Sequence, residues 1–519
     1  MVCVGRVFLF GVALSIFLAT GSFASSNVET ESPFWIVIDG GSTGSRLHIF
    51  EFIDDRVERR GSSRANFPLS AFGRTGEDLL KPLNATKVAE HLLPTFVFAA
   101  EKIPKQYHAS TPVYYQATAG MRLLDDTEQE ALYDALYQGL VESPDFMFSN
   151  LQRENIATLS GEAEGFYGAV AANYLQGTID VDLNFIATDA APIGALDMGG
   201  SSTQIVFLPS LSSGSSTPDN YWRSCVSDDL MTHEPILIEA ALQDCHKAQS
   251  SNELPSRLNG PDFFATSYLS YGVEKFRERL WTLWVKEHVE NIKPNECDLG
   301  VVENPCLFPG YSIEWMGHTL KGTGDAGKCI EQVKRLIPHP HQPDHDHKLG
   351  THVGGVEHPQ VQGKFLAMSL YFFTLDSLRV LSGHEALELS WPSPSIAELY
   401  DALPGLCSRE WHTDLSINGK HEFTSDDVLP HRCLESVYLV TLLRDGFGFS
   451  MDSRDITFTF LVDGNEVEWG LGMVLSLHAA QHARHEMEQE DDSNSTHRRA
   501  TIPKVGQYLW EFLTENFLS

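Results

Sequence analysis

The sequence predicts a layered α/β fold, and three observations support this prediction. Apolar segments with strand character alternate with segments of helical periodicity along the chain. The 519 residues, of which 42% are hydrophobic, provide material for two to four domains at about 150 residues per domain. A short motif that follows an apolar strand also occurs twice, which favours an internal duplication.

The expected elements follow from these patterns in chain order. Strands are predicted at Trp35–Ile38, Leu47–Phe52 and Val113–Gln116, and helices at Thr86–Lys102 and Glu128–Glu142. A second β-rich unit is expected to begin near residue 195. Helical stretches are then predicted at Tyr268–Val289 and Phe365–Leu381.

The repeated motif combines a strand, an aspartate and a loop of Gly, Ser and Thr. Its first copy ends the strand Phe34–Ile38 with Asp39, and its second copy carries Asp197, 158 residues later (197 − 39 = 158). Backbone N–H groups and hydroxyls in such a loop can surround an anion, while the strand fixes the carboxylate beside them. One copy is common in ordinary turns, but two copies favour a duplicated architecture that holds a nucleotide.

The chain is strongly acidic, with a net charge of −33. This excess of acidic side chains excludes a general nucleic-acid surface, because such a surface needs basic side chains that replace the counterions of the phosphates. An anionic substrate would have to be bound with a divalent cation and a local group of N–H donors.

The N-terminal 24 residues carry one Arg, an apolar run from Val7 to Ala19 and a small-residue patch before Ser25. The run is short for a membrane span, so a cleaved signal peptide is expected, with an uncleaved signal anchor as the alternative. The sequons at Asn84 and Asn494 fit this route. We therefore expect a secreted or lumenal protein that contacts a membrane only if the N-terminal segment is retained.

Two further segments look like insertions or exposed tails. The stretch 339–358 is rich in His, Pro and Gly; it could bind zinc or copper, but it lacks zinc-finger spacing and a solvated loop is expected. The polar run His482–Arg499 is predicted to be an exposed linker, followed by helical spacing at Ile502–Phe517.

Of eight cysteines, Cys3 lies in the signal segment, which leaves seven and at least one without an intramolecular partner.

Four segments resemble the signatures of the apyrase family, the nucleoside triphosphate diphosphohydrolases, and they occur in family order. They are Asp39–Arg46, Tyr115–Arg122, Ser160–Gly168 and Leu196–Gln204. A weaker likeness continues to about Leu477, so that the resemblance covers most of the mature chain.

The resemblance implies two actin-like, ribonuclease-H-like lobes with the active site in the cleft between them. Lobe I would comprise residues 33–160 plus about 468–519, and lobe II residues 161–467. The resemblance also implies the disulfides Cys306–Cys329 and Cys407–Cys433. It assigns no partners to Cys225, Cys245 and Cys297, and it places Ser270 where many relatives have a cysteine.

The family pattern further implies a role for each motif residue. Glu164 would be the general base, while the neighbouring Glu162 would face the surface or cap the helix that runs through Leu175. Asp39 and Asp197 would orient Ca²⁺ or Mg²⁺, mostly through water. The phosphate contacts would come from Ser42, Thr43, Gly44, Gly199, Gly200 and Ser201, with Thr118 contacting phosphate and Ser202 and Gln204 holding the attacking water and the metal's water shell.

Two assignments remain open between a functional and a structural role. Arg122 would bind phosphate or form a structural ion pair. Phe373 and Tyr438 would stack on the base, although aromatic residues at helical spacing are also common in cores.

Proteins of other classes fit the sequence less well. A sugar kinase or chaperone ATPase would leave the Glu164 motif and the secretory features unexplained. A non-catalytic surface protein on an apyrase scaffold would be expected to lack Glu164, Asp39 or Asp197, yet all three are present. Within the family, the sequence allows a broad apyrase or a diphosphatase that prefers GDP and UDP, and Gly44 favours the soluble and lumenal branches.

Overall fold

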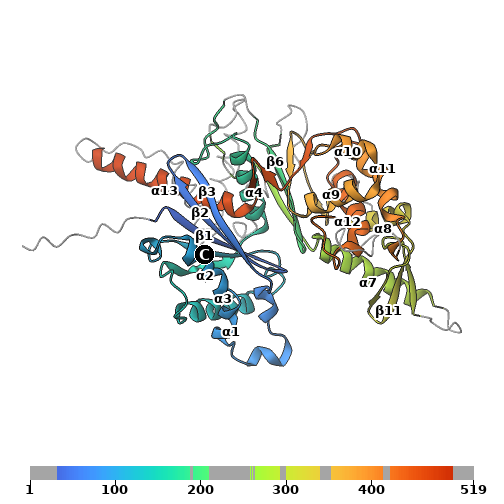
Figure 1. Cartoon of the computed structure of the whole chain (residues 1–519), viewed down its shortest axis with the longest axis horizontal. Coiled ribbons are helices and arrows are strands. Elements are labelled where there is room, and N and C mark those ends of the chain that lie inside the picture. Colours follow the sequence, from blue (N-terminus) through green and yellow to red (C-terminus); the bar gives the residue numbers. More distant parts are fainter. Residues whose placement is uncertain are drawn as a thin grey trace, which may run out of the picture.

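The computed structural model describes residues 32–187, 191–209, 257–258, 260, 263–292, 300–338, 352–412 and 421–494, which form two five-stranded sheets surrounded by helices (Figure 1). The predicted signal segment, the helical spacing at Ile502–Phe517 and most of the His-rich stretch lie outside these residues, as do Cys225, Cys245 and Cys297.

The two large sheets have the same topology. The first contains β1 (Phe34–Gly41), β2 (Gly44–Ile53), β3 (Arg56–Ala65), β4 (Val113–Ala117) and β5 (Leu151–Thr158), in the order β3-β2-β1-β4-β5. The second contains β6 (Gly194–Met198), β7 (Ser202–Phe207), β8 (Phe264–Leu269), β14 (Phe365–Ala367) and β15 (Ile456–Phe458), in the order β15-β14-β6-β7-β8. In each sheet, three antiparallel strands are followed by two strands parallel to the first. This repetition confirms the two-lobed α/β fold.

Helices cover the sheets in three groups. The first sheet is covered by α1 (Ala85–Glu90), α2 (Leu93–Lys102) and α3 (Asp126–Val141). Between the sheets lie α4 (Gly161–Leu175) and α13 (Trp469–Asn494), which share one core with residues of β1, β2, β6, β7 and β14. The second sheet carries α7 (Val273–Asn291), α8 (Ala326–Leu336), α9 (Leu370–Ser382), α10 (Glu385–Ser390), α11 (Ile396–Cys407) and α12 (Arg432–Thr441). Within this core, α4 packs mainly on β6, β7 and β8, and α13 packs on β1, β2 and α4. The lobe boundary near Ser160 stays a prediction.

The smaller strands lie in the second lobe and in the segment that leads back to the first lobe. A three-stranded sheet is formed by β9 (Val301–Asn304), β10 (Ser312–Trp315) and β11 (His318–Gly322), and hairpins by β12 (His352–Val353) with β13 (Val356–Glu357) and by β16 (Leu461–Val462) with β17 (Asn465–Glu466). The implied disulfides Cys306–Cys329 and Cys407–Cys433 are both formed. None of the helices in the described ranges is long and apolar enough to cross a membrane.

Several predicted elements need correction. The helix expected over Thr86–Lys102 is two helices, since α2 starts at Leu93 with a proline in its first turn, where the missing N–H costs nothing. Tyr268 belongs to β8, and α7 begins only after Gly272. The segment from Phe365 begins as the buried strand β14 before α9, because a short apolar run fits a buried strand as well as a helix.

Two segments expected to be exposed and irregular are partly ordered. Residues 482–494 of the predicted linker continue α13, which is consistent with their high content of Glu, Gln, Met and Ala. His358, at the end of the His-rich stretch, is buried, and its ring nitrogens lie 2.9 Å from the carbonyl oxygen of Pro359 and 2.8 Å from that of Gly446. It is a core histidine and does not lie in a solvated loop.

Candidate active site

The first phosphate-loop candidate is the tight turn between β1 and β2. Gly41 pairs with Gly44, so Ser42 and Thr43 form the tip of the hairpin. Gly44 has φ 157°, and a Cβ built there would lie 2.4 Å from the carbonyl oxygen of Ala65, which explains why this position is glycine. The Thr118 N–H donates to the Gly40 carbonyl over 3.0 Å, which fixes the second motif against this loop.

The second loop, Gly199–Ser201, is held by the start of α7. The N–H groups of Val273 and Glu274 donate to the carbonyls of Gly199 and Gly200 over 3.1 and 3.0 Å. These first-turn donors have no partner within their own helix, so the loop satisfies them. Because the C=O and N–H of one peptide point in opposite directions, the N–H groups of Gly200 and Ser201 point away from α7.

The two loops lie close to each other. A Cβ built on Gly200 would lie 3.1 Å from the Ser42 Oγ. The Ser201 Oγ is buried and has no hydrogen-bond partner in the described structure, so it is a donor without an acceptor. Opposed N–H groups and hydroxyls of this kind suit adjacent phosphate groups of one polyphosphate.

Asp39 and Asp197 occupy equivalent places in the two sheets. Asp39 pairs in register with Arg46, and Asp197 pairs with Gln204, seven residues later in each case (46 − 39 = 7; 204 − 197 = 7). Burial raises the pKa of Asp39 to about 7; Arg46 opposes this shift, and the charge of Asp197 adds to it. Burial likewise raises the pKa of Asp197, against a hydrogen bond from Ser369.

Glu164 lies in the first turn of α4, whose N-terminus is capped by the Ser160 side chain. Gln204 Nε2 donates to Glu164 Oε2 over 3.0 Å, and Arg122 forms an ion pair with the same oxygen. Both contacts end on Oε2, so Oε1 is the oxygen left to accept a proton. The neighbouring Glu162 is exposed, as expected for a surface residue.

The buried environment of Glu164 raises the proton affinity of its carboxylate. Burial raises the pKa of Glu164 to about 8; Arg122 lowers it, and the charges of Asp197 and Asp39 raise it. A carboxyl group whose pKa is raised toward neutral pH is typical of an acid–base catalyst that works near neutral pH.

The two aspartates offer the kind of ligand that a divalent cation requires. Asp39 Oδ1 is buried without a hydrogen-bond partner in the described structure, and the like charge of Asp197 contributes to the raised pKa of Asp39. A set of carboxylate oxygens is the donor type that Ca²⁺ and Mg²⁺ prefer. The residues present therefore fit the predicted cation.

The structure shows one of the two contacts considered for Arg122. Its Nη2 pairs with Glu164 and its Nη1 lies 3.3 Å from Ser267 Oγ, so it forms the ion pair of the structural alternative. A role of Arg122 in binding phosphate stays a prediction. Ser202 also lies in the network, since its Oγ accepts from Gln204 Nε2 over 2.8 Å.

Sequence reasoning missed several residues of this site. Ser267 connects Arg122 to Gln204, and Ser369 hydrogen-bonds to Asp197 from a backbone with φ 55°. Arg64 Nη2 donates to Thr43 Oγ1 over 3.1 Å at the tip of the first loop. Single Ser or Arg residues on distant strands carry no motif, so only the fold identifies them.

The expected base-binding pair requires a correction. Tyr438 is only 1% exposed, stacks on Phe276 at 3.8 Å between ring centroids, and donates its hydroxyl to the Tyr271 carbonyl. It is a core residue with no face presented to a base. Phe373, in the first turn of α9, is half-buried beside Phe423 and Phe460, and its stacking on a base stays a prediction.

Comparisons with known proteins agree with this geometry. The chain is 27% identical over 490 residues to the Golgi apyrase of Saccharomyces cerevisiae, covering 86% of this chain and 70% of that protein. It is 27% identical over 476 residues to human ectonucleoside triphosphate diphosphohydrolase 8, covering 87% and 83%. The crystal structure of nucleoside triphosphate hydrolases from Neospora caninum shares the fold, with a TM-score of 0.58 and 17% identity over 92% of this chain and 95% of that chain.

A family model also matches nearly the whole described chain. The GDA1/CD39 (nucleoside phosphatase) family model matches residues 25–229 and 237–490, a span that contains both loops and the carboxylates of Asp39, Glu164 and Asp197. The chain therefore belongs to the GDA1/CD39 (nucleoside phosphatase) family and is a nucleotide phosphohydrolase of the apyrase type.

Proposed function

We propose that this enzyme hydrolyses the phosphoanhydride bonds of nucleoside tri- and diphosphates by direct attack of water, with Glu164 as the general base. The observation that supports this most directly is the position of Glu164, which Arg122 and Gln204 hold at the junction of the two lobes. The opposed loops around Ser42 and Gly200 would bind adjacent phosphates.

The residues around Glu164 would each hold the attacking water or take its proton. Gln204 Nε2 faces three acceptors, on Glu164, Ser202 and Ser267, so its amide oxygen is left to accept from water. Ser202 Oγ accepts from this amide, which leaves its own proton for the attacking water. Glu164 Oε1 then takes a proton from that water as its oxygen bonds to the terminal phosphorus and the bridging P–O bond breaks, which releases the shortened nucleotide.

Asp39, Asp197 and, through water, Gln204 would hold Ca²⁺ or Mg²⁺. When bound, such a cation neutralises phosphate oxygens and the leaving phosphate. Without it, the two aspartates would repel the substrate, since the chain carries a net charge of −33. Turnover should vanish in EDTA and return with Ca²⁺ or Mg²⁺, and undiminished turnover in chelator would contradict the metal assignment.

The decisive experiment compares Glu164→Gln with Asp197→Asn. Glu164→Gln should lower kcat about 10²–10⁴-fold, the usual range for a lost general base, with nucleotide affinity little changed. Asp197→Asn should weaken metal-dependent nucleotide binding as well as turnover. If Glu164→Gln keeps more than about a tenth of wild-type kcat, another group is the base.

The substrate range and the compartment are finer proposals. The relatives named as apyrases and a nucleoside-diphosphatase support both tri- and diphosphate substrates, with a GDP- and UDP-preferring diphosphatase as the alternative. Phosphate release from ATP, ADP, GDP and UDP distinguishes them. The two disulfides support an oxidising compartment of the secretory pathway or the cell exterior.

A further inference from the structure

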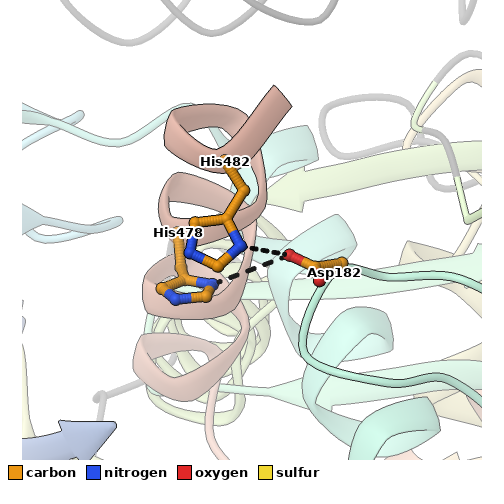
Figure 2. Close-up of side chains that lie close together, drawn as sticks. All are labelled: Asp182, His478 and His482. Carbon is orange, nitrogen blue, oxygen red and sulfur yellow. Dashed lines mark ion pairs between the residues drawn. The ribbon is translucent and has the colours of Figure 1, made fainter. Parts of the chain in front are cut away.

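Three side chains outside the nucleotide site converge where α13 passes a turn that follows α4. Asp182 Oδ1 lies 3.0 Å from His482 Nδ1 and 3.9 Å from His478 Nδ1 (Figure 2). The ligand-type atoms of all three residues lie within 4.8 Å of one another. None of these residues belongs to the phosphate loops or to the buried carboxylates described above.

The helix presents its two histidines in a fixed geometry. His478 and His482 are four residues apart, so they lie on the same face of α13, one turn apart. The His478 ring stacks on Phe52 with centroids 4.0 Å apart and planes 11° apart, which fixes its orientation. The turn before it is anchored in the core between the sheets by Val474 and Leu475.

Asp182 is held equally firmly from the other side. Asp180 Oδ1 accepts the N–H groups of Asp182 and Asn184 over 3.0 and 2.8 Å, which closes a tight turn. The flanking residues Val181 and Leu183 are buried in the same core. The carboxylate is thus carried on a rigid turn and directed toward α13 (Figure 2).

The polar atoms at the point of convergence lack ordinary partners. Asp182 Oδ1 and His478 Nδ1 are both buried, yet neither makes a hydrogen bond of acceptable geometry within the described structure. An imidazole nitrogen and a carboxylate oxygen that face each other in this way can both offer a lone pair to a metal ion.

We propose that Asp182, His478 and His482 form a second metal site, distinct from the nucleotide site, that takes a first-row transition metal and Zn²⁺ in particular. Two imidazoles and one carboxylate are ligands that Zn²⁺ accepts, with water in the fourth position. Zn–N bonds of about 2.0–2.1 Å in tetrahedral geometry separate neighbouring ligand atoms by roughly 3.3 Å. The observed 3.0 and 3.9 Å separations lie on either side of this value. Bound metal would tie α13 to the turn at residue 182.

The test must exclude two other places where zinc could bind. The full chain is therefore used with His339, His341, His345 and His347 changed to Gln, and excess Mg²⁺ is present to occupy the aspartate site. Zn²⁺ is titrated against a chromophoric chelator, and Co²⁺ is added separately to look for the visible absorption of a tetrahedral ion. One equivalent of Zn²⁺ should bind, and it should raise the melting temperature.

Matched variants assign that equivalent to the three residues. His482→Ala and Asp182→Asn should each weaken zinc binding by at least about tenfold and abolish the thermal shift, as expected for the loss of a ligand or of its charge. The control Gln481→Ala, exposed on the same helical turn, should leave both unchanged. Melting temperatures without zinc check folding, and Mg²⁺-dependent phosphate release should be retained by all variants. Equal zinc affinity in parent and His482→Ala, or no bound zinc in the parent, would overturn the proposal.

Discussion

Replacing Arg122 by glutamine should move the acid limb of the pH–rate profile to higher pH. The guanidinium pairs with Glu164 Oε2, and its positive charge lowers the pKa of that carboxyl. A general base works only when it is deprotonated, so removing the cation leaves a larger fraction of Glu164 protonated at neutral pH. The substitution keeps a donor amide but removes the charge.

The burial of the Arg122–Glu164 pair determines the size of the expected pKa shift. Both side chains are largely buried, with 15% and 11% of their surfaces exposed, so solvent screens the pair only weakly. An opposite charge in contact typically lowers a carboxyl pKa by about 1–3 units. Arg122→Gln should therefore raise the acid limb by about 1–3 pH units, which corresponds to a roughly 10- to 10³-fold loss of kcat/KM on that limb.

The assay is steady-state phosphate release with saturating divalent cation over a wide pH range. Arg122→Gln should recover activity at high pH, Arg122→Lys should keep the acid limb near its wild-type position, and Glu164→Gln should recover at no pH. A raised KM with an unmoved acid limb would show that Arg122 binds phosphate and does not tune the base.

Three further changes test other parts of the molecule. A Cβ at Gly272 would lie 2.3 Å from the carbonyl carbon of Gly200, so Gly272→Ala should displace the second loop and lower kcat/KM about 10²-fold in steady-state kinetics, with circular dichroism unchanged. Replacing Cys407 and Cys433 together by Ser should cost about 2–5 kcal/mol in urea unfolding, and an unchanged unfolding midpoint would contradict this. Burial lowers the pKa of His431 from 6.5 to about 3, so its neutral form stabilises the fold above pH 6.5 and this stability is lost as the pH falls toward 3. Between neutral pH and pH 5, the free energy of unfolding should therefore fall by about 1–2 kcal/mol less in His431→Gln than in the wild type.

Local motifs predicted the parts of the site that depend on neighbouring residues. Asp39 and Asp197 each lie near the end of a strand that leads into a glycine-rich turn, and Glu164 follows a serine cap, so short spacing alone predicts their places on β1, β6 and α4. The equal spacing of the two motifs also predicted the repeated lobe, because a loop that recurs after a strand implies that its sheet recurs.

Residues whose environment depends on distant contacts could not be predicted in this way. The helical spacing around Tyr438 suits a core aromatic as well as a base-stacking one, and its burial depends on Phe276, more than a hundred residues earlier (438 − 276 = 162). Ser267 and Ser369 reach the site only because β8 and β14 flank the central strands of the second sheet. Likewise, His482 looks like the start of a polar linker until α13 is seen to pass Asp182.

The duplicated sheets have matching backbones, but their chemistry differs at one register position. Arg46 faces Asp39, pairs with Glu466 at 2.8 Å and lowers the pKa of that aspartate, whereas the equivalent Gln204 is neutral and reaches Glu164 instead. A second cation at this position would pair with Glu164 and make it a weaker base, since an opposite charge lowers the pKa of a carboxyl. A neutral amide orients the same carboxylate through a hydrogen bond at little cost in basicity. The divergence of these two positions therefore allows one lobe to stabilise a charged aspartate while the other supports proton transfer.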